Sequence, residues 1–416
     1  MSADAKAAID AVWRIESPRL IAGLARMVRN LDRAEELAQD AFVSALVQWP
    51  ETGIPRNPGA WLATVAKRRA IDAIRRQKRL EVKQTAMHRE LESTQEFDDP
   101  FATIDDVGDD LLRLIFVACH PVLATESRVA LTLRLLGGLT TTEIARAFLV
   151  SEATIAQRIV RAERTLSEAR VPFETPDASK RAPRLSSVLE VLYLIFNEGY
   201  SATAGDDVMR PGLCEDALRL GRVLAELVAD ETEVHGLVAL MEIQASRSKA
   251  RVDALGAPIL LMEQDRTRWD RVLVARGLTA LRRAEKLGGT FGPYALQAAI
   301  AACHARARTG AETDWARIAA LYDALAALAP SPVVRLNRAV AIGMAFGPAA
   351  GLELADALVS EPSLRAYHLL PSVRADLLKK LNRFSEARSE FERAASLARN
   401  TRDRDLLLER AAACRF

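Results

Sequence analysis

A chain of 416 residues is long enough for two to four domains with well-packed cores. Half of its residues are apolar and only 5% are aromatic, a composition typical of packed Ala- and Leu-rich helices and not of sheets. The net charge of +2 excludes a uniformly basic surface, so any attraction for nucleic acid must be local. No leader opens the chain and no uncharged apolar run reaches about 18 residues, so we expect a cytoplasmic protein without a membrane partner.

The residues that usually bind metals are scattered along the chain. The four cysteines form no CxxC pair and have no histidine at ligand spacing, so we expect reduced thiols, no metal and no cofactor. No phosphate-binding loop or nucleophile motif appears either, and we expect that the protein is not an enzyme. The cysteines are Cys119, Cys214, Cys303 and Cys414.

Three helices around one small core are predicted for residues 5–80. They are a helix over residues 5–29 with a break at Ser17-Pro18, a helix over residues 32–49 that Asp32 caps and Pro50 stops, and a helix that Asn57-Pro58 begins and that ends near Lys78.

The rest of the chain is also predicted to be helical, so the expected fold class is all-α. Residues 81–108 lack apolar periodicity and are predicted to be an acidic linker, and helices resume over residues 109–171. Prolines mark a second linker at residues 172–184, and residues 185–416 follow as one large helical domain. Within that domain, residues 325–352 resemble residues 372–391, with an offset of about 36 residues. This internal repeat favours tetratricopeptide-like helical hairpins over a generic bundle.

Charge along the third predicted helix is one-sided. Seven of its side chains between Lys67 and Arg79 are basic and one, Asp72, is acidic, and residues 81–110 then carry ten Asp or Glu. Such a reversal of sign between neighbouring segments is typical of proteins that bind nucleic acid. A solvated helix end is the alternative interpretation.

A helix-turn-helix is predicted over residues 139–164. Thr140 or Thr141 caps a short helix through Phe148, a two-residue turn follows, and Ser151 caps the next helix. The outward side chains of that second helix include Gln and Arg, which read adenine and guanine edges in the major groove. They are Glu152, Ala153, Thr154, Gln157, Arg158, Arg161 and Arg164. A solvated amphipathic helix is the alternative.

The predicted helix over residues 32–49 is acidic, although its neighbour is basic. DNA would be repelled by its outward face, so this helix calls for a protein partner instead.

These segments together resemble extracytoplasmic-function sigma factors of the sigma-70 family. The stretch from Asp32 to Phe42, with Pro58, Trp61, Leu62, Ala66, Asp72 and Arg75-Arg76, is similar to their regions 2.2 to 2.4, and residues 139–164 are similar to region 4.2. The remainder, and residues 189–200 in particular, resembles a subgroup with a long tetratricopeptide-like extension.

The resemblance implies a sigma factor that binds core RNA polymerase and directs promoter-specific initiation. Contacts to the β′ clamp helices of the polymerase are implied for Asp32, Glu35, Glu36, Leu37, Gln39, Asp40 and Phe42, and the polymerase β subunit is expected as a further partner. Contacts to the −10 element of promoter DNA are implied for Arg56, Asn57, Trp61, Lys67, Arg68, Arg75, Arg76 and Arg79. The helix-turn-helix would read the −35 element. The chain departs from many relatives at Arg68, where they carry an Asn that helps to hold an unstacked −10 base.

Residues 185–416 show no chemistry of their own, and we expect a regulatory domain that binds a protein or a ligand. The acidic linker has the sign of RNA and is predicted to occupy the nucleic-acid path of the polymerase. Two other functions stay open at this point. One is a helix-turn-helix regulator with a helical-repeat sensor that is not a polymerase subunit, and the other is a repeat scaffold that contacts RNA.

Overall fold

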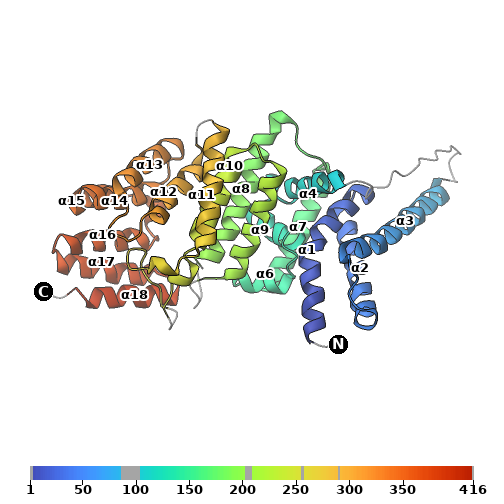
Figure 1. Cartoon of the computed structure of the whole chain (residues 1–416), viewed down its shortest axis with the longest axis horizontal. Coiled ribbons are helices and arrows are strands. Elements are labelled where there is room, and N and C mark those ends of the chain that lie inside the picture. The colour runs from blue at the N-terminus through green and yellow to red at the C-terminus, as the bar shows by residue number, and fades with distance from the viewer. Residues whose placement is uncertain (1–2, 86–103, 202–208, 254–256, 289–290, 415–416) are drawn as a thin grey trace. The chain divides into compact units, whose positions relative to one another are not determined.

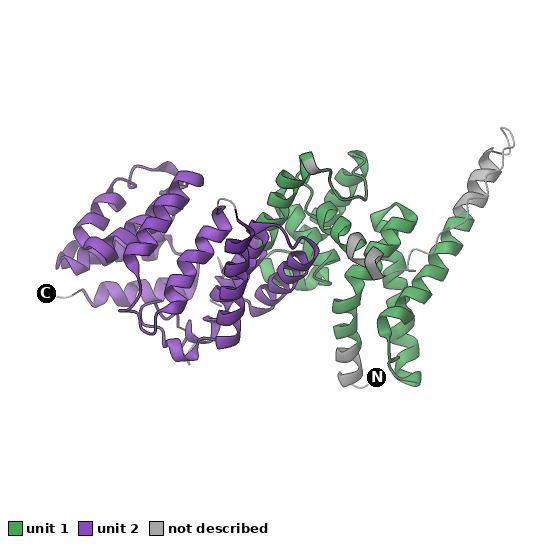
Figure 2. Ribbon diagram, turned by 45° about the horizontal axis from the view of Figure 1, so that its top comes forward, with its two compact units in different colours: residues 1–192 green, residues 193–416 purple. Residues whose placement is uncertain are grey.

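The computed structural model describes residues 3–85, 104–201, 209–253, 257–288 and 291–414, and every regular element within these ranges is a helix. Near the ends of α1, α3, α4 and α8 it describes the backbone without some of the side chains. The chain divides into two compact units, residues 1–192 and residues 193–416 (Figure 2). The prediction of an all-α fold is confirmed.

The first unit contains a three-helix group and the helices that follow the acidic segment (Figure 1). Its helices are α1 (Ala3–Val28), α2 (Leu31–Thr52), α3 (Pro58–Thr85), α4 (Ile104–Ala118), α5 (Thr125–Leu135), α6 (Thr141–Phe148), α7 (Glu152–Glu168) and the first part of α8 (Ala178–Tyr200).

Helices α1, α2 and α3 share one core. Leu20 and Leu24 of α1 are buried with Leu62 of α3, and the rings of Trp49 and Trp61 meet edge to face with their centroids 5.3 Å apart. The predicted break at Ser17-Pro18 is wrong, because α1 runs through Pro18 without interruption. Burial of the apolar side chains on this helix offsets the one backbone hydrogen bond that proline removes.

Several predicted helix ends in this group are also wrong. Helix α2 starts one residue before Asp32, because the Asn30 side chain accepts the Arg33 amide and acts as the N-cap. It continues through Pro50 to Thr52, and Gly53 then ends it with a φ of +81°. The predicted start of α3 is confirmed, since the Asn57 side chain accepts the Ala60 amide at 3.0 Å.

Helices extend into both predicted linkers. Helix α3 continues past Lys78 to Thr85, and α4 begins at Ile104 and not at Asp109. Residues 86–103, the middle of the predicted acidic linker, lie outside the described residues.

Helix α8 starts inside the second predicted linker and passes through Pro183. Arg184 donates to the Phe116 carbonyl at 2.6 Å, and the Ser187 hydroxyl donates to the Cys119 carbonyl at 2.6 Å. These are carbonyl oxygens at the C-terminal end of α4, where a helix has no backbone donors of its own. The first half of α8 therefore caps α4 and belongs to the first unit.

The second unit is a succession of helices, most of them joined by short connections, with a longer stretch between Ala250 and Arg266 (Figure 1). They are α9 (Pro211–Leu227), α10 (Thr232–Ala245), η1 (Ser248–Ala250), η2 (Arg266–Arg268), α11 (Arg271–Leu287), α12 (Pro293–Arg306), α13 (Trp315–Leu328), α14 (Pro332–Phe346), α15 (Pro348–Asp356), η3 (Pro362–Leu364), α16 (Leu369–Lys380), α17 (Phe384–Leu397) and α18 (Thr401–Ala412).

Prolines begin several helices of this unit, and glycines let two of its helices pack closely. Pro211, Pro293 and Pro332 each open a helix, where the missing N–H costs nothing and the fixed φ is already helical. Gly351 of α15 faces Gly343 of α14 so closely that a Cβ on Gly351 would lie 2.7 Å from the Gly343 Cα. The two stretches that look repeated are helix pairs, α14 with α15 and α16 with α17, as predicted for helical hairpins.

Candidate nucleic-acid interface

Helices α6 and α7 form the predicted helix-turn-helix. The Thr140 hydroxyl accepts the Glu143 amide while the Glu143 carboxylate accepts the Thr140 amide, which makes a complete capping box at the start of α6. Leu149 adopts a left-handed conformation with a φ of +51° in the turn, and the Ser151 hydroxyl caps α7 by accepting the Thr154 amide at 3.1 Å. The cap positions and the turn that the sequence predicted are confirmed.

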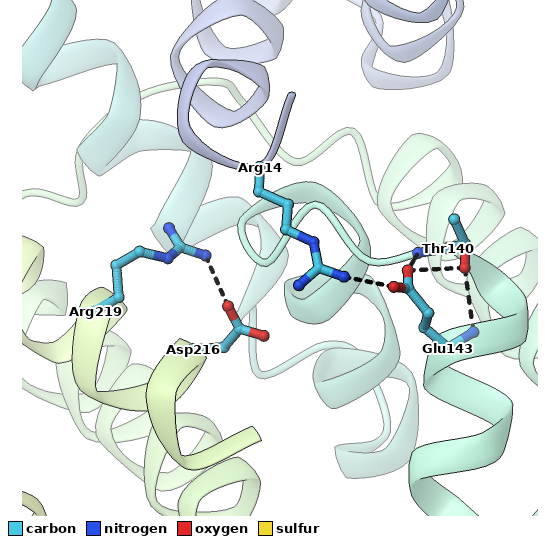
Figure 3. Close-up of polar contacts among 5 residues, drawn as sticks. All are labelled: Arg14, Thr140, Glu143, Asp216 and Arg219. Atoms are coloured by element: carbon cyan, nitrogen blue, oxygen red, sulfur yellow. Dashed lines mark hydrogen bonds and ion pairs between the residues drawn. The ribbon is translucent and has the colours of Figure 1, made fainter. Parts of the chain in front are cut away.

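An ion pair fastens the start of α6 to α1. Arg14 donates to the Glu143 carboxylate that closes the capping box, so one side chain serves both the helix cap and the contact between α1 and α6 (Figure 3). Burial alone would raise the pKa of the Glu143 carboxyl, but the hydrogen bonds from Thr140 and the Arg14 guanidinium lower it below its usual value. The carboxylate is therefore charged, and the contact persists, throughout the neutral range.

The outward face of α7 carries the residues predicted for DNA. None of the seven is buried: Thr154 and Arg158 are half-buried and the other five are exposed. They face outward because Ile155, Ile159 and Leu166 bury the opposite face of α7 in the core. Arg164 is paired with Glu168 one turn further along at 2.6 Å, an exposed pair that solvent screens.

Two apolar residues on the same face were missed by the sequence prediction. Ala156 is exposed, and Val160 has 62% of its surface exposed. The prediction assigned apolar side chains to the core, although the spacing of Ala156, Gln157, Val160 and Arg161 puts all four on one helical face. An exposed apolar side chain between Gln and Arg fits the methyl group of thymine in a major groove.

The basic side chains of α3 divide into two groups. Arg68, Arg75 and Arg76 are exposed, and Lys67 is half-buried. Arg69, in contrast, lies 3.3 Å from the Asp40 carboxylate and donates to the Ser44 hydroxyl at 2.8 Å, so it holds α3 against α2. Three cations along α3 thus face solvent, and the side chain of Arg79 lies outside the described part of the helix.

The remaining residues predicted for the −10 element lie just before α3 and in its first turn. Arg56 and Asn57 are exposed, and Asn57 also caps the helix. Trp61 is half-buried and its ring packs edge to face against Trp49.

Helix α2 presents an acidic and apolar stripe to solvent. Glu36, Asp40, Val43 and Val47 are exposed and recur at the spacing of one helical face, with Val43 56% and Val47 66% exposed. The sequence prediction named Glu36 and Asp40, together with the exposed Asp32, but missed both valines. Of the other residues predicted there, Leu37 is buried in the core and Phe42 packs on Trp13 with ring centroids 4.6 Å apart.

The N-terminal end of α2 is covered within the first unit. Glu35 is only 8% exposed, and its carboxylate accepts from Arg134 of α5 at 2.6 Å and from Gln39 at 2.7 Å. Burial, together with the charges of Asp32 and Glu35, raises the pKa of the Glu163 carboxyl on α7 to about 8. The Arg134 guanidinium thus pairs with Glu35 of α2 and, through its charge, also favours the ionised form of Glu163 on α7.

No described helix is long and apolar enough to cross a membrane, and the described residues contain no group of three His, Cys, Asp or Glu placed to hold a metal ion. The exposed features are instead a helix-turn-helix, a basic helix and an acidic helix. Together they define a DNA-binding protein that also offers a surface to another protein.

Comparison with known proteins agrees with this class. Residues 13–80 match the family model for sigma-70 region 2, residues 113–166 match sigma-70 region 4, and residues 184–285 match a family of unknown function, DUF6596. An uncharacterised protein of Rhizobium meliloti (strain 1021) is 46% identical over 389 residues, which cover 92% of this chain and 90% of the relative. No solved structure matches.

The chain belongs to the extracytoplasmic-function sigma factors of the sigma-70 family, in a form with a C-terminal helical extension. It acts in promoter-directed transcription, with core RNA polymerase and promoter DNA as its partners.

Proposed function

We propose that α2 docks on the β′ clamp helices of the polymerase, that α3 and the loop before it open the −10 element, and that α7 reads the −35 element. The observation that carries this assignment is the exposure of three different faces on one unit: the acidic stripe of α2, the cations of α3, and the Gln and Arg face of α7. A simple repressor would need only the last of these.

The stripe on α2 fits a helical protein partner better than it fits DNA. Its two carboxylates repel phosphates, while Val43 and Val47 give an apolar strip that a neighbouring helix can bury. Glu36 is paired with Arg33 at 2.6 Å and Asp40 with Arg69 at 3.3 Å, so both acids are already oriented at the surface. The polymerase β subunit is the expected partner of the second half of the unit.

Promoter opening cannot come from this chain alone. Separating a duplex costs about 1.4 kcal/mol per base-pair step, more than a few exposed arginines return. The polymerase supplies most of the interaction energy, and the sigma factor fixes the register and holds an unstacked base. The presence of Arg68 in place of the Asn of many relatives implies that a guanidinium, which stacks on a base and binds phosphate, contacts that base.

Reconstitution with core polymerase tests the docking surface. Val47→Asp places a charge in the apolar strip, and we expect it to weaken polymerase binding and promoter-specific runoff transcription about 10-fold or more. Val272→Asp is the matched control, since Val272 is 64% exposed in the second unit and its change should leave both unaffected. Equal loss in the two variants, or none, would contradict docking through α2.

The same mixture separates the alternative function. A helix-turn-helix regulator that is not a polymerase subunit would bind duplex DNA without core polymerase and would tolerate Val47→Asp. Promoter-specific transcripts that require both the core enzyme and an intact α2 support the sigma factor assignment in detail.

For residues 193–416 we propose a regulatory role toward a protein or ligand partner. Comparing transcription by the full chain with transcription by residues 1–192 tests it, and equal activity and response under all conditions would contradict it. The acidic segment 81–108 is proposed to enter the nucleic-acid path of the polymerase. Replacing its Asp and Glu by Asn and Gln should then change the yield of abortive transcripts.

A further inference from the structure

Three arginine side chains and two aromatic rings meet in the second unit, where the chain passes from α10 through η1 and η2. The Arg251 guanidinium lies 3.7 Å from the centre of the Tyr200 ring, and Arg247 donates to the Tyr200 hydroxyl at 2.6 Å. Arg247 and Arg266 lie over the ring of Trp269, at 5.7 and 5.2 Å from its centre. Residues 200–269 of the sequence thus bring three positive charges to one place.

The polar atoms of this cluster are poorly satisfied. Arg247 Nε, Arg251 Nη1, Arg266 Nε, Trp269 Nε1 and His304 Nδ1 are all buried and have no hydrogen-bond partner in the described structure. Trp269 is 3% exposed and His304 is 7% exposed, so bulk water does not reach them. Each buried donor without a partner costs about 1–3 kcal/mol, and so many in one cluster indicate a missing acceptor.

The cluster also differs from other arginines of this protein in its ion pairs. The buried Arg128 lies 2.9 Å from the Glu190 carboxylate, and the half-buried Arg222 lies 2.8 Å from that of Glu242. Within the described part of the chain, no carboxylate forms an ion pair with Arg247, Arg251 or Arg266.

The positive charges within the cluster repel one another. Burial lowers the pKa of Arg266, and the charge of Arg247 lowers it further, whereas the charge of Glu312 opposes the shift. Burial and then Arg247 and Arg266 lower the pKa of His304 to about 4, so its ring is neutral at neutral pH. The carboxylates of Glu312 and Asp403 act on Arg266 and Arg251 through their charge, without forming an ion pair with either guanidinium.

The three arginines are not equally committed to the fold. Arg266 donates to the carbonyls of His304 and Ala307 and to the Thr313 hydroxyl, and so ties η2 to the end of α12. The Arg247 side chain has one hydrogen bond, to Tyr200, and the Arg251 side chain stacks on that ring and interacts with the charge of Asp403. Arg247, Arg251 and Tyr200 are half-buried, whereas Arg266 and Trp269 are buried, so a ligand would enter from the side of the first three.

We propose that this cluster, Tyr200, Arg247, Arg251, Arg266 and Trp269, is a binding site for an oxyanion, a phosphate or carboxylate group carried by a small ligand. Guanidinium groups match the geometry of both anions with paired hydrogen bonds, and a bound oxyanion supplies acceptors for the unpartnered donors and a direct ion pair for the arginines. The aromatic faces hold the guanidinium planes in position before the ligand arrives.

Inorganic phosphate and malonate, each added to the full chain against sodium chloride at the same ionic strength, test the proposal. We expect a saturable rise in Tm and a binding isotherm for at least one of them, because a ligand that binds only the folded state stabilises it. Phosphate alone would identify a phosphoryl group, malonate alone a carboxylate, and both a general oxyanion site. No saturable response to either overturns the proposal.

Substitutions within the cluster test whether the anion binds there. Arg251→Gln should raise the apparent Kd about 10-fold or more, since hydrogen bonds to charged groups are strong. Tyr200→Phe keeps the ring but removes the hydroxyl that orients Arg247, and should weaken binding to a smaller degree. Arg276→Gln removes the same charge from an exposed position of α11 and should bind like the unchanged chain. Binding that survives both cluster variants, with their circular dichroism unchanged, also overturns the proposal.

Discussion

Single side chains decide which surfaces of this protein are open to a partner. Gln157 and Val160 are exposed because Ile155 and Ile159 occupy the inward face of α7, whereas Glu35 is closed off by one guanidinium, Arg134. The acidic residues of α2 are therefore not equivalent. Glu36 and Asp40 are exposed although each is paired with an arginine, whereas Glu35 is buried and becomes available only if Arg134 leaves it.

Gln157 is one of the residues predicted to contact the −35 element. Replacing it by Ala removes a side chain that can bond an adenine edge, and we expect a loss of about 1–3 kcal/mol in discrimination at one base pair. Runoff transcription from promoters altered singly in the −35 element measures this. Ser167→Ala, an exposed change near the C-terminal end of α7, is the control. Unchanged base preference after Gln157→Ala would count against α7 as the reading helix.

Glu163 predicts a pH dependence of stability. Its pKa of about 8 in the folded protein lies above the ordinary value of 4.5, so between these values the folded state binds a proton that the unfolded state has released. Stability contributed at this site is therefore present at acidic pH and is lost as the pH rises through that interval. We expect Glu163→Gln, which cannot ionise, to have a higher Tm than the unchanged chain at pH 8 and a similar Tm at pH 5.

Thermal unfolding at several pH values checks this expectation. Glu174→Gln, at an exposed loop position, should retain the pH slope of the unchanged chain. A Glu163→Gln variant whose Tm differs from that of the unchanged chain by the same amount at every pH would show that the carboxyl of Glu163 does not titrate in this interval.

At the scale of elements, the exposed arginines of α3 predict how strongly DNA binding depends on salt. If Arg68, Arg75 and Arg76 neutralise phosphates, log K should fall with log salt at a slope of roughly −3 from this helix. Arg68→Gln with Arg75→Gln should reduce the steepness by about 2, whatever the promoter sequence. Titrations of the polymerase complex from low to physiological salt measure the slope, with Arg276→Gln as the control. A slope that does not change would place the phosphate contacts elsewhere.

Elements with strong local signals could be predicted from the sequence. Thr140 and Ser151 cap helices through their own side chains, and Asn57-Pro58 starts α3, so the start of each of these helices needed no knowledge of the fold. The predicted breaks at Pro18 and Pro50 failed because packing against distant residues keeps each helix intact across its proline.

The exposed valines were missed for the opposite reason. Periodicity assigns apolar residues to a core, and only the three-dimensional packing shows that Val43, Val47 and Val160 are left outside it. The arginine cluster could not be foreseen at all. It joins residues from 200 to 304 along the sequence, and no spacing within the chain indicates that they meet.

At the scale of the whole molecule, the boundary between the two units falls inside α8. A fragment ending at Ala182, in the predicted linker, would lose Ser187 and Glu190 and leave the Arg128 guanidinium with only Thr125 of its three side-chain partners. We expect it to be less stable than residues 1–192 by about 1–3 kcal/mol for each buried group left unpaired. Urea unfolding of the two fragments compares them directly, and equal midpoints would show that α8 contributes nothing to the first unit.

All four cysteines are free and buried, and burial raises the pKa of Cys119 to about 11 and that of Cys214 to about 12. Because the thiolate is the reactive form, these sulfurs should be nearly inert toward maleimide dyes at neutral pH. A cysteine introduced at an exposed position could then be labelled selectively without replacing any native one. The unaltered background of this chain is thus suited to fluorescence measurements of its motion during initiation.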